Sequence, residues 1–185
     1  LRQDAITESF FTLTQQLMHG HRAIISLIGE YGWTLKTVRS IWEKLAFENN
    51  VCLTDYPTNL GTDIKPARAY QYLGQEFDAL FVDISGPLRP DAVAILVGCI
   101  RGGGLICLYW GESLESKPIE EHLHVEGWHT SEIGSRLRSR LVASVSQSKH
   151  CLLRQDMKVP IEELFCGFTR TERPYEWTSD QRAAH

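Results

Sequence analysis

The chain has 185 residues, of which 43% are hydrophobic and 23% are charged, and its formal net charge is −4. This is ordinary for a soluble globular protein of one domain plus a tail, and no apolar run approaches the ~20 residues of a membrane span. The acidic balance is not that of a typical nucleic-acid-binding protein, although it leaves room for a local basic patch.

The first third of the chain alternates helical and strand patterns. Apolar residues at helical spacing predict an amphipathic helix over residues 4–19, and the run AIISLI at 23–28 predicts a buried strand. After a turn at 29–33, we expect Thr34 to cap a second helix that ends near residues 49–50. A short strand at 51–53, a loop at 55–63 and a short helix at 67–73 complete this part.

Residues 77–110 carry the clearest pattern of the chain. The run at 79–82 predicts a strand buried on both faces, and Pro90 with Asp91 opens a helix whose buried side carries Val93, Ile95, Leu96 and Ile100. We expect the glycines at 102–104 to terminate this helix and residues 105–108 to form the next strand. Strand, helix and strand then form one βαβ unit.

The last third is less regular. An i, i+4 stripe of Ile133, Leu137, Leu141 and Val145 predicts a helix at 132–147, and residues 151–153 suggest a late strand. We therefore expect an α/β, three-layer Rossmann-like domain with a mostly parallel sheet over residues 1–158. Residues 159–185 have no apolar period and are expected to form a linker.

Ligands of open α/β sheets bind beyond the carboxyl ends of the strands, which singles out a small set of positions. These crevice candidates follow the strands expected at 23–28 and 79–82: Gly29, Glu30, Gly32, Asp83 and Ser85. Backbone N–H groups of a Gly-x-x-Gly turn could hold a phosphate, and the acid could bind a ribose or a metal. The same features also serve a tight turn and a capped strand end. Neither a GxGxxG nor a GxxxxGK[ST] motif is present.

Metal and disulfide chemistry have no support in the spacing of the ligand residues. Three histidines at 122, 124 and 129 are close in sequence, but they show neither an i, i+4 pair nor a neighbouring cysteine, so we expect no metal site. The odd number of five cysteines and the lack of a CxxC motif predict free thiols in a reducing, cytoplasmic environment. No signal peptide is visible at the start of the sequence.

Basic residues concentrate near the end of the predicted domain. Residues 132–158 hold six Lys or Arg residues against two acids, an excess of four positive charges. Arg136 and Arg140 share one flank of the predicted helix, and Arg138 lies on the other. These three arginines are candidate contacts to an RNA backbone, and the alternative is a solvated or salt-bridged helix face.

An ordered set of motifs gives a family resemblance over roughly residues 20–155. The set consists of GEYGW at 29–33, LGQEFD at 73–78 before LFVD at 80–83, LRPD at 88–91, RGGGLI at 101–106 and RLRSRL at 136–141. It resembles the N-terminal domain of the tRNA(Met) cytidine acetyltransferase family, RNA-helicase-like enzymes that make N4-acetylcytidine. The family's arginine motif usually carries Phe where this chain has Leu137 and Leu141.

The resemblance implies a non-catalytic domain that packs on the ATPase module of its parent chain, with an acetyltransferase module and tRNA as further partners. Acetyl-CoA, ATP and Mg²⁺ are implied for the full-length parent, and no cofactor is implied for this chain. WTSDQ at 177–181 resembles the lead-in to the ATPase module. Two alternatives remain: a class I S-adenosylmethionine-dependent methyltransferase-like domain, and a plain protein-interaction domain.

Overall fold

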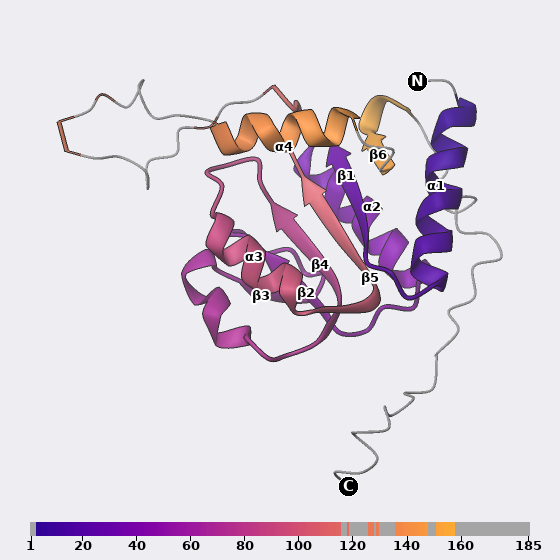
Figure 1. Ribbon diagram of the computed structural model, residues 1–185, viewed down its shortest axis with the longest axis horizontal. Helices are drawn as coiled ribbons and strands as arrows, with labels where there is room; N and C mark the ends of the chain where they lie inside the picture. The colour runs from indigo at the N-terminus through magenta and orange to yellow at the C-terminus, as the bar shows by residue number, and fades with distance from the viewer. Residues whose placement is uncertain are drawn as a thin grey trace, which may run out of the picture.

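The computed structural model describes residues 3–115, 136–147 and 151–157, together with Pro118, Glu126, Gly127 and His129. Its core is a parallel six-stranded sheet with the strand order β3-β2-β4-β5-β1-β6 (Figure 1). The strands are β1 (Ala23–Ile28), β2 (Asn50–Leu53), β3 (Thr62–Ile64), β4 (Phe77–Asp83), β5 (Ile100–Tyr109) and β6 (Cys151–Arg154). The expected α/β, three-layer Rossmann-like class is confirmed.

Helices cover both faces of the sheet. The helices α1 (Gln3–Met18) and α2 (Tyr31–Lys44) pack on the first face, against inward side chains such as Ile25 and Phe81. The second face is covered by the 3-10 helix η1 (Pro66–Tyr72) and by α3 (Pro90–Gly98) and α4 (Arg136–Gln147). Figure 1 shows α3 and α4 in front of the sheet and α2 behind it. A second 3-10 turn, η4 (Gln155–Met157), directly follows β6.

The βαβ unit predicted at 77–110 is the centre of the sheet. β4 and β5 pair in parallel from Phe77 with Ile100 to Asp83 with Tyr109, and α3 joins them. Apolar side chains such as Phe81 and Leu80 are fully buried on opposite faces of β4. Burial on both faces explains why this strand is a continuous apolar run without alternation.

Three local expectations are wrong. The helix α2 begins at Tyr31 after Glu30, so Thr34 lies in its first turn and its N–H binds the carbonyl of Glu30. The loop expected at 55–63 contains the start of β3, which pairs with β2. The glycines at 102–104 lie inside β5 and do not end α3, which stops at Gly98.

The glycines of β5 allow this strand to pass close under the end of α1. A Cβ on Gly102 would lie 2.9 Å from the carbonyl oxygen of Gly20, and a Cβ on Gly103 would lie 3.2 Å from that of Leu17. Gly103 also has a φ of +75°, which an L side chain rarely adopts. The sequence signal of three glycines therefore marks a close approach of two backbones.

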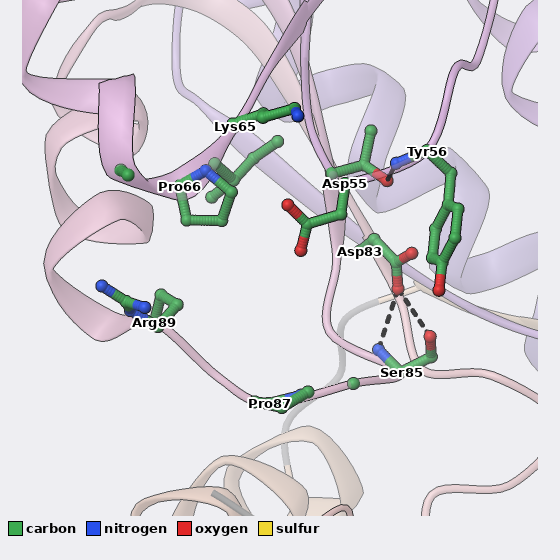
Figure 2. Close-up of a pocket in the computed structure, with 12 residues that line it drawn as sticks. Asp55, Tyr56, Lys65, Pro66, Asp83, Ser85, Pro87 and Arg89 are labelled. Atoms are coloured by element: carbon green, nitrogen blue, oxygen red, sulfur yellow. Dashed lines mark hydrogen bonds between the residues drawn. The ribbon is translucent and has the colours of Figure 1, made fainter. Parts of the chain in front are cut away.

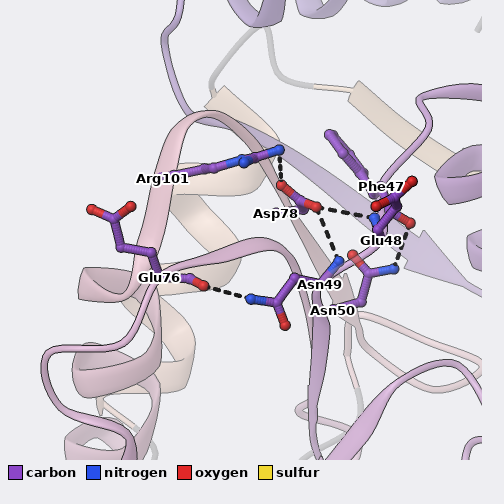
Figure 3. Close-up of polar contacts among 7 residues, drawn as sticks. All are labelled: Phe47, Glu48, Asn49, Asn50, Glu76, Asp78 and Arg101. Atoms are coloured by element: carbon purple, nitrogen blue, oxygen red, sulfur yellow. Dashed lines mark hydrogen bonds and ion pairs between the residues drawn. The ribbon is translucent and has the colours of Figure 1, made fainter. Parts of the chain in front are cut away.

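A polar cluster ties the amino edge of the sheet together (Figure 3). The Asp78 carboxylate accepts hydrogen bonds from the N–H groups of Glu48 and Asn49, each at 3.0 Å, and forms an ion pair with Arg101. The Asn49 side chain donates to the carbonyl of Glu76. These contacts fix the connection between α2 and β2 against β4 and β5.

Candidate functional site

The carboxyl ends of the six strands meet at one edge of the sheet, where ligands of this class of fold bind. The chain leaves β1 toward α2 on the first face, whereas α4, the next described helix after β5, packs on the second face. β1 and β5 are neighbours in the sheet, and the chain continues to opposite faces after them. The change of face therefore lies between these two strands. A shallow pocket of about 430 Å³ opens here, lined by Ile28, Gly29, Glu30, Glu112, Arg154, Gln155 and Asp156.

This first pocket is poorly suited to a phosphate. The Gln155 side chain accepts the N–H of Glu30 at 2.8 Å, and a Cβ on Gly29 would lie 2.8 Å from both Gln155 and the Trp33 ring. The space over Gly29 is therefore occupied by protein. Acids outnumber bases in the lining, and Arg154 pairs with Asp156 at 3.3 Å.

Gly32, the second glycine of the predicted turn, does not line either of the two pockets described here. A Cβ on Gly32 would meet nothing within 4 Å, so no close approach requires this glycine. The turn at residues 29–32, which the sequence predicts as a phosphate site, thus lies at the carboxyl edge of the sheet. Gln155 occupies the space that a phosphate would need.

A second pocket lies beyond the carboxyl ends of β2, β3 and β4 (Figure 2). Its volume is about 520 Å³, within the range of about 300–1,000 Å³ typical of small-ligand sites. The lining includes the predicted candidates Asp83 and Ser85 and also Tyr56, which the sequence places beyond the strand expected at 51–53. It adds three charged residues that the sequence did not single out: Asp55, Lys65 and Arg89.

A compact turn shapes the floor of this strand-end pocket. The Asp83 Oδ1 atom accepts the N–H of Ser85 at 3.0 Å and its hydroxyl at 2.6 Å. This is the Asx turn that a strand-end acid commonly forms, so part of the carboxylate is used structurally. Among the described residues, no hydrogen bond to Asp83 Oδ2 is found, and this oxygen keeps its acceptor capacity.

A group of aromatic rings lies near the carboxyl edge of the sheet, beside the strand-end pocket. Tyr31 contacts the rings of Tyr56, Phe81 and Tyr109, with centroids between 5.5 and 6.5 Å apart. Burial raises the pKa of the Tyr31 and Tyr109 phenols, and the nearby Asp83 charge raises both further. Both phenols are therefore neutral hydrogen-bonding groups at physiological pH.

The three candidate arginines of α4 divide into two kinds. Arg138 is 4% exposed and donates to the carbonyls of Ile84 at 2.7 Å and Gly86 at 2.6 Å. It holds the loop after β4, so its guanidinium is not presented to a phosphate. Arg136 and Arg140 are exposed, and no ion pair to either is found among the described residues.

The buried side of α4 differs from the predicted stripe. Leu137 is 45% exposed, whereas Arg138 and Val145 are buried and Leu141 and Val142 are partly buried. The spacing of residues 138, 141, 142 and 145 is itself helical, and this signal could have identified Arg138 as an inward residue. The sequence at 132–135, including Ile133, lies outside the described residues.

Comparison with known proteins gives the chain its family. The family model for the N-terminal domain of tRNA(Met) cytidine acetyltransferase TmcA matches residues 5–156, which include nearly all of the described fold. This chain belongs to the tRNA(Met) cytidine acetyltransferase family. It represents the N-terminal domain, as the ordered motifs at 29–141 predicted.

Two relatives show how much of the family's full length this chain covers. The tRNA(Met) cytidine acetyltransferase TmcA of Nitrosococcus halophilus is 24% identical over 159 residues, which are 83% of this chain and 21% of that protein. The enzyme of the same name from Saccharolobus islandicus is 34% identical over 65 residues, 35% of this chain and 9% of that protein. The matched region thus covers about a fifth of the length of the first relative and less than a tenth of the second.

The expectations for histidines, cysteines and the linker can be compared with the structure only where these residues are described. Within the described residues, no group of three or more His, Cys, Asp or Glu side chains could hold a metal ion, and no helix is long and apolar enough to cross a membrane. His122, His124, Cys166 and the expected linker at 159–185 lie outside the described part. The four described cysteines, Cys52, Cys99, Cys107 and Cys151, are buried free thiols.

Proposed function

We propose that this chain is the non-catalytic N-terminal domain of a tRNA(Met) cytidine N4-acetyltransferase, which packs on the ATPase module of its parent and contacts tRNA. In the parent, acetyl-CoA, ATP and Mg²⁺ would serve the acetyl transfer in other modules. The observation that carries the proposal is the family match over residues 5–156, combined with relatives about five times longer than the matched region.

The chemistry of this chain supports a non-catalytic role. The sequence has no Walker A loop, and the glycine turn at the β1–α2 junction is covered by Gln155. These residues do not fit the phosphates of ATP. We also infer a cytoplasmic location, in keeping with the buried free thiols of the described chain.

The contact to tRNA rests on the exposed flank of α4. Arg136 and Arg140 lie one helical turn apart, and α4 contains no acidic residue. Exposed guanidinium groups bind phosphates through charge-assisted hydrogen bonds. Such contacts position an RNA backbone without reading its sequence.

Binding of tRNA to the 185-residue chain tests this part of the proposal. Replacing Arg136 and Arg140 together with Ala should weaken binding of every tRNA alike and lower the salt dependence by about two units of slope. Lys36→Ala with Lys44→Ala is the charge-matched control, because both lysines are exposed on α2 in the opposite layer. Equal losses in both double variants, or no loss in either, would contradict a role of α4.

A turnover assay tests the non-catalytic role. The purified chain should neither hydrolyse ATP nor transfer acetyl groups from acetyl-CoA to tRNA. ATP hydrolysis that Asp83→Ala abolishes would show that the strand-end pocket is an active site and would refute the assignment.

The alternative of a methyltransferase-like domain is disfavoured by the strand order. In the order 3-2-1-4-5-6 of dinucleotide-binding folds, the first strand neighbours the second and fourth, and its glycine loop holds the cofactor. Here β1 lies between β5 and β6, and the loop after it is filled by Gln155. A plain protein-interaction domain remains the second candidate, and loss of the RNA effect in the assay above would favour it.

A further inference from the structure

The strand-end pocket of about 520 Å³ has no role in the function proposed above. Its two sides differ in chemistry. Figure 2 shows Lys65 and Arg89 on one side, Tyr56, Asp83 and Ser85 on the other, and the Asp55 carboxylate between them. A cationic side opposite an aromatic and carboxylate side suits a ligand that carries a phosphate at one end and a polar ring at the other.

Tyr56 provides a stacking surface at the mouth of the pocket. Tyr56 is 64% exposed, so a face of its ring is open to a ligand. The ring is nevertheless fixed in place, because it contacts Tyr31 edge-on at a centroid distance of 6.4 Å and an interplanar angle of 69°. Its backbone N–H also donates to the Thr54 hydroxyl at 3.1 Å. An exposed ring held in this way can accept a base by stacking.

Lys65 and Arg89 provide the cationic side. Lys65 is exposed, and no ion pair to it is found among the described residues. Arg89 approaches Asp91 only at 4.0 Å, and both side chains are solvent-exposed, so this pair contributes little and does not occupy the guanidinium. Either group can bind a phosphate oxygen.

The Asp83 carboxylate provides a selective group beside the ring. Its Oδ1 atom is held by both hydrogen bonds from Ser85, which fixes the direction of Oδ2. An ionised carboxylate only accepts hydrogen bonds, so it favours a partner with an N–H donor. Cytosine, adenine and guanine carry an exocyclic amino group, whereas uracil has a carbonyl oxygen where cytosine has its amino group. The N3–H donor of uracil lies between two carbonyl oxygens, which repel a carboxylate.

The pocket and α4 are joined by a direct contact. The buried Arg138 of α4 donates to the carbonyl of Gly86, which lines the pocket. The exposed Arg136 and Arg140 lie two residues before and after Arg138 in the same helix. The loop that borders the pocket is therefore anchored to the same helix that carries the exposed arginines.

We propose that the strand-end pocket binds a single unpaired nucleotide of an RNA strand, with its base stacked on Tyr56, its phosphate on Lys65 or Arg89, and its amino group on Asp83. The inference deepens the proposed contact of this domain with RNA and rests on it. It adds a preference for amino-bearing bases over uracil, which phosphate contacts to α4 cannot produce.

Fluorescence anisotropy with labelled oligocytidylate and oligouridylate of equal length tests the proposal on the 185-residue chain at low salt. The native chain should bind oligocytidylate more tightly. Tyr56→Ala should weaken binding at least about fivefold, because stacking of one base on an aromatic ring contributes about 1–3 kcal/mol. Tyr56→Phe keeps the ring and should bind like the native chain.

Asp83→Asn separates base selection from the shape of the pocket. The Asn carbonyl can keep both hydrogen bonds from Ser85, while its amide replaces Oδ2 by an N–H donor that suits uracil. The preference for oligocytidylate should disappear or reverse, with the melting temperature unchanged. Equal binding of both oligonucleotides by the native chain would overturn the proposal, as would an unchanged preference in the variant.

Two further arms separate this inference from the role of α4 and from free nucleotides. Loss of tRNA binding in the Arg136→Ala/Arg140→Ala variant, with no effect of the Tyr56 and Asp83 variants on oligonucleotides, would refute the pocket alone. The reverse result would support the pocket and refute the α4 contact. Cytidine 5′-monophosphate should compete more weakly than oligocytidylate, and equal affinity would refute assignment to an RNA strand.

Discussion

The Asp78 carboxylate, in β4, forms an ion pair with the Arg101 guanidinium, in β5, and also caps the two N–H groups that precede β2. The Asp78 side chain is 5% exposed and the Arg101 side chain 41% exposed, so the two partners are not equivalent. The buried carboxylate organises three segments, whereas the arginine neutralises its charge from the surface.

This asymmetry predicts unequal costs of removing the two side chains. Asp78→Ala should lower the free energy of unfolding by about 3 kcal/mol, because two partly buried N–H groups and the arginine all lose their partner. Arg101→Ala should cost only about 1 kcal/mol, because water still reaches that side of the carboxylate. Urea denaturation of both variants measures the difference. A larger loss for Arg101→Ala would show that the ion pair, and not the capping, is the main contribution.

Arg138 should behave differently from its two neighbours in α4. Arg138→Ala leaves the carbonyls of Ile84 and Gly86 without their donor and removes a buried side chain, so it should lower the free energy of unfolding by about 2–4 kcal/mol. Arg136→Ala and Arg140→Ala are matched controls on exposed positions and should each change it by less than about 0.5 kcal/mol. Thermal unfolding compares the three variants, and equal melting temperatures would show that Arg138 is not an anchor.

The buried thiols predict a loss of stability at alkaline pH. Burial raises the pKa of the Cys52 thiol from 9.0 to about 12, despite a hydrogen bond from Thr58 that lowers it, and burial also raises those of Cys107 and Cys151. Each thiol ionises in the unfolded chain near pH 9 while it stays neutral in the folded chain. The contribution of each neutral, buried thiol to the free energy of unfolding is therefore complete below pH 9. It is lost as the pH rises from there toward the pKa of the thiol in the folded chain.

Chemical unfolding between pH 8 and pH 10.5 measures this effect. Well above pH 9, each buried thiol should lower the free energy of unfolding by about 1.4 kcal/mol per pH unit. Cys52→Ala should reduce the alkaline slope by about that amount relative to the native chain. An identical slope in the variant would show that Cys52 ionises alike in both states.

Gly29 and Gln155 should be energetically coupled across the first pocket. Gly29→Ala places a methyl group against Gln155 and Trp33 and should lower the free energy of unfolding by about 1–3 kcal/mol. Gln155→Gly removes both Gln155 atoms that the methyl group would meet, the Cβ and the Oε1, so the double variant should lose less than the sum of the single variants. A double-mutant cycle by urea denaturation measures the coupling, and strict additivity would contradict the contact.

The parts of the fold that the sequence predicts are those in which burial determines the residue pattern. The strands at 23–28 and 79–82 are buried apolar runs, and both are present in the sheet. The strand β3 could not be recognised because Thr62 and Asp63 are polar and exposed, and pairing with β2 alone defines it. The amino-acid composition of a short segment does not predict such pairing with a distant strand.

The candidate site shows the same division. Asp83 and Ser85 could be selected because they follow a clear strand. Lys65 follows the unrecognised β3, and Arg89 reaches the pocket only through the folding of the loop before α3. The burial of Arg138 is set by the rotation of α4 about its own axis. Charge alone cannot identify which of three arginines on one helix points inward.

The place of β1 between β5 and β6 has a consequence for synthesis on the ribosome. Within the described part of the chain, residues 23–28 pair with residues 105–109 and 151–154, so this early strand gains these partners after most of the domain has been made. The unit of β4, α3 and β5 has local contacts and can form first, whereas closing the long loop to β1 is slow. Until β5 emerges, the apolar strand AIISLI is a segment that a chaperone must shield from aggregation.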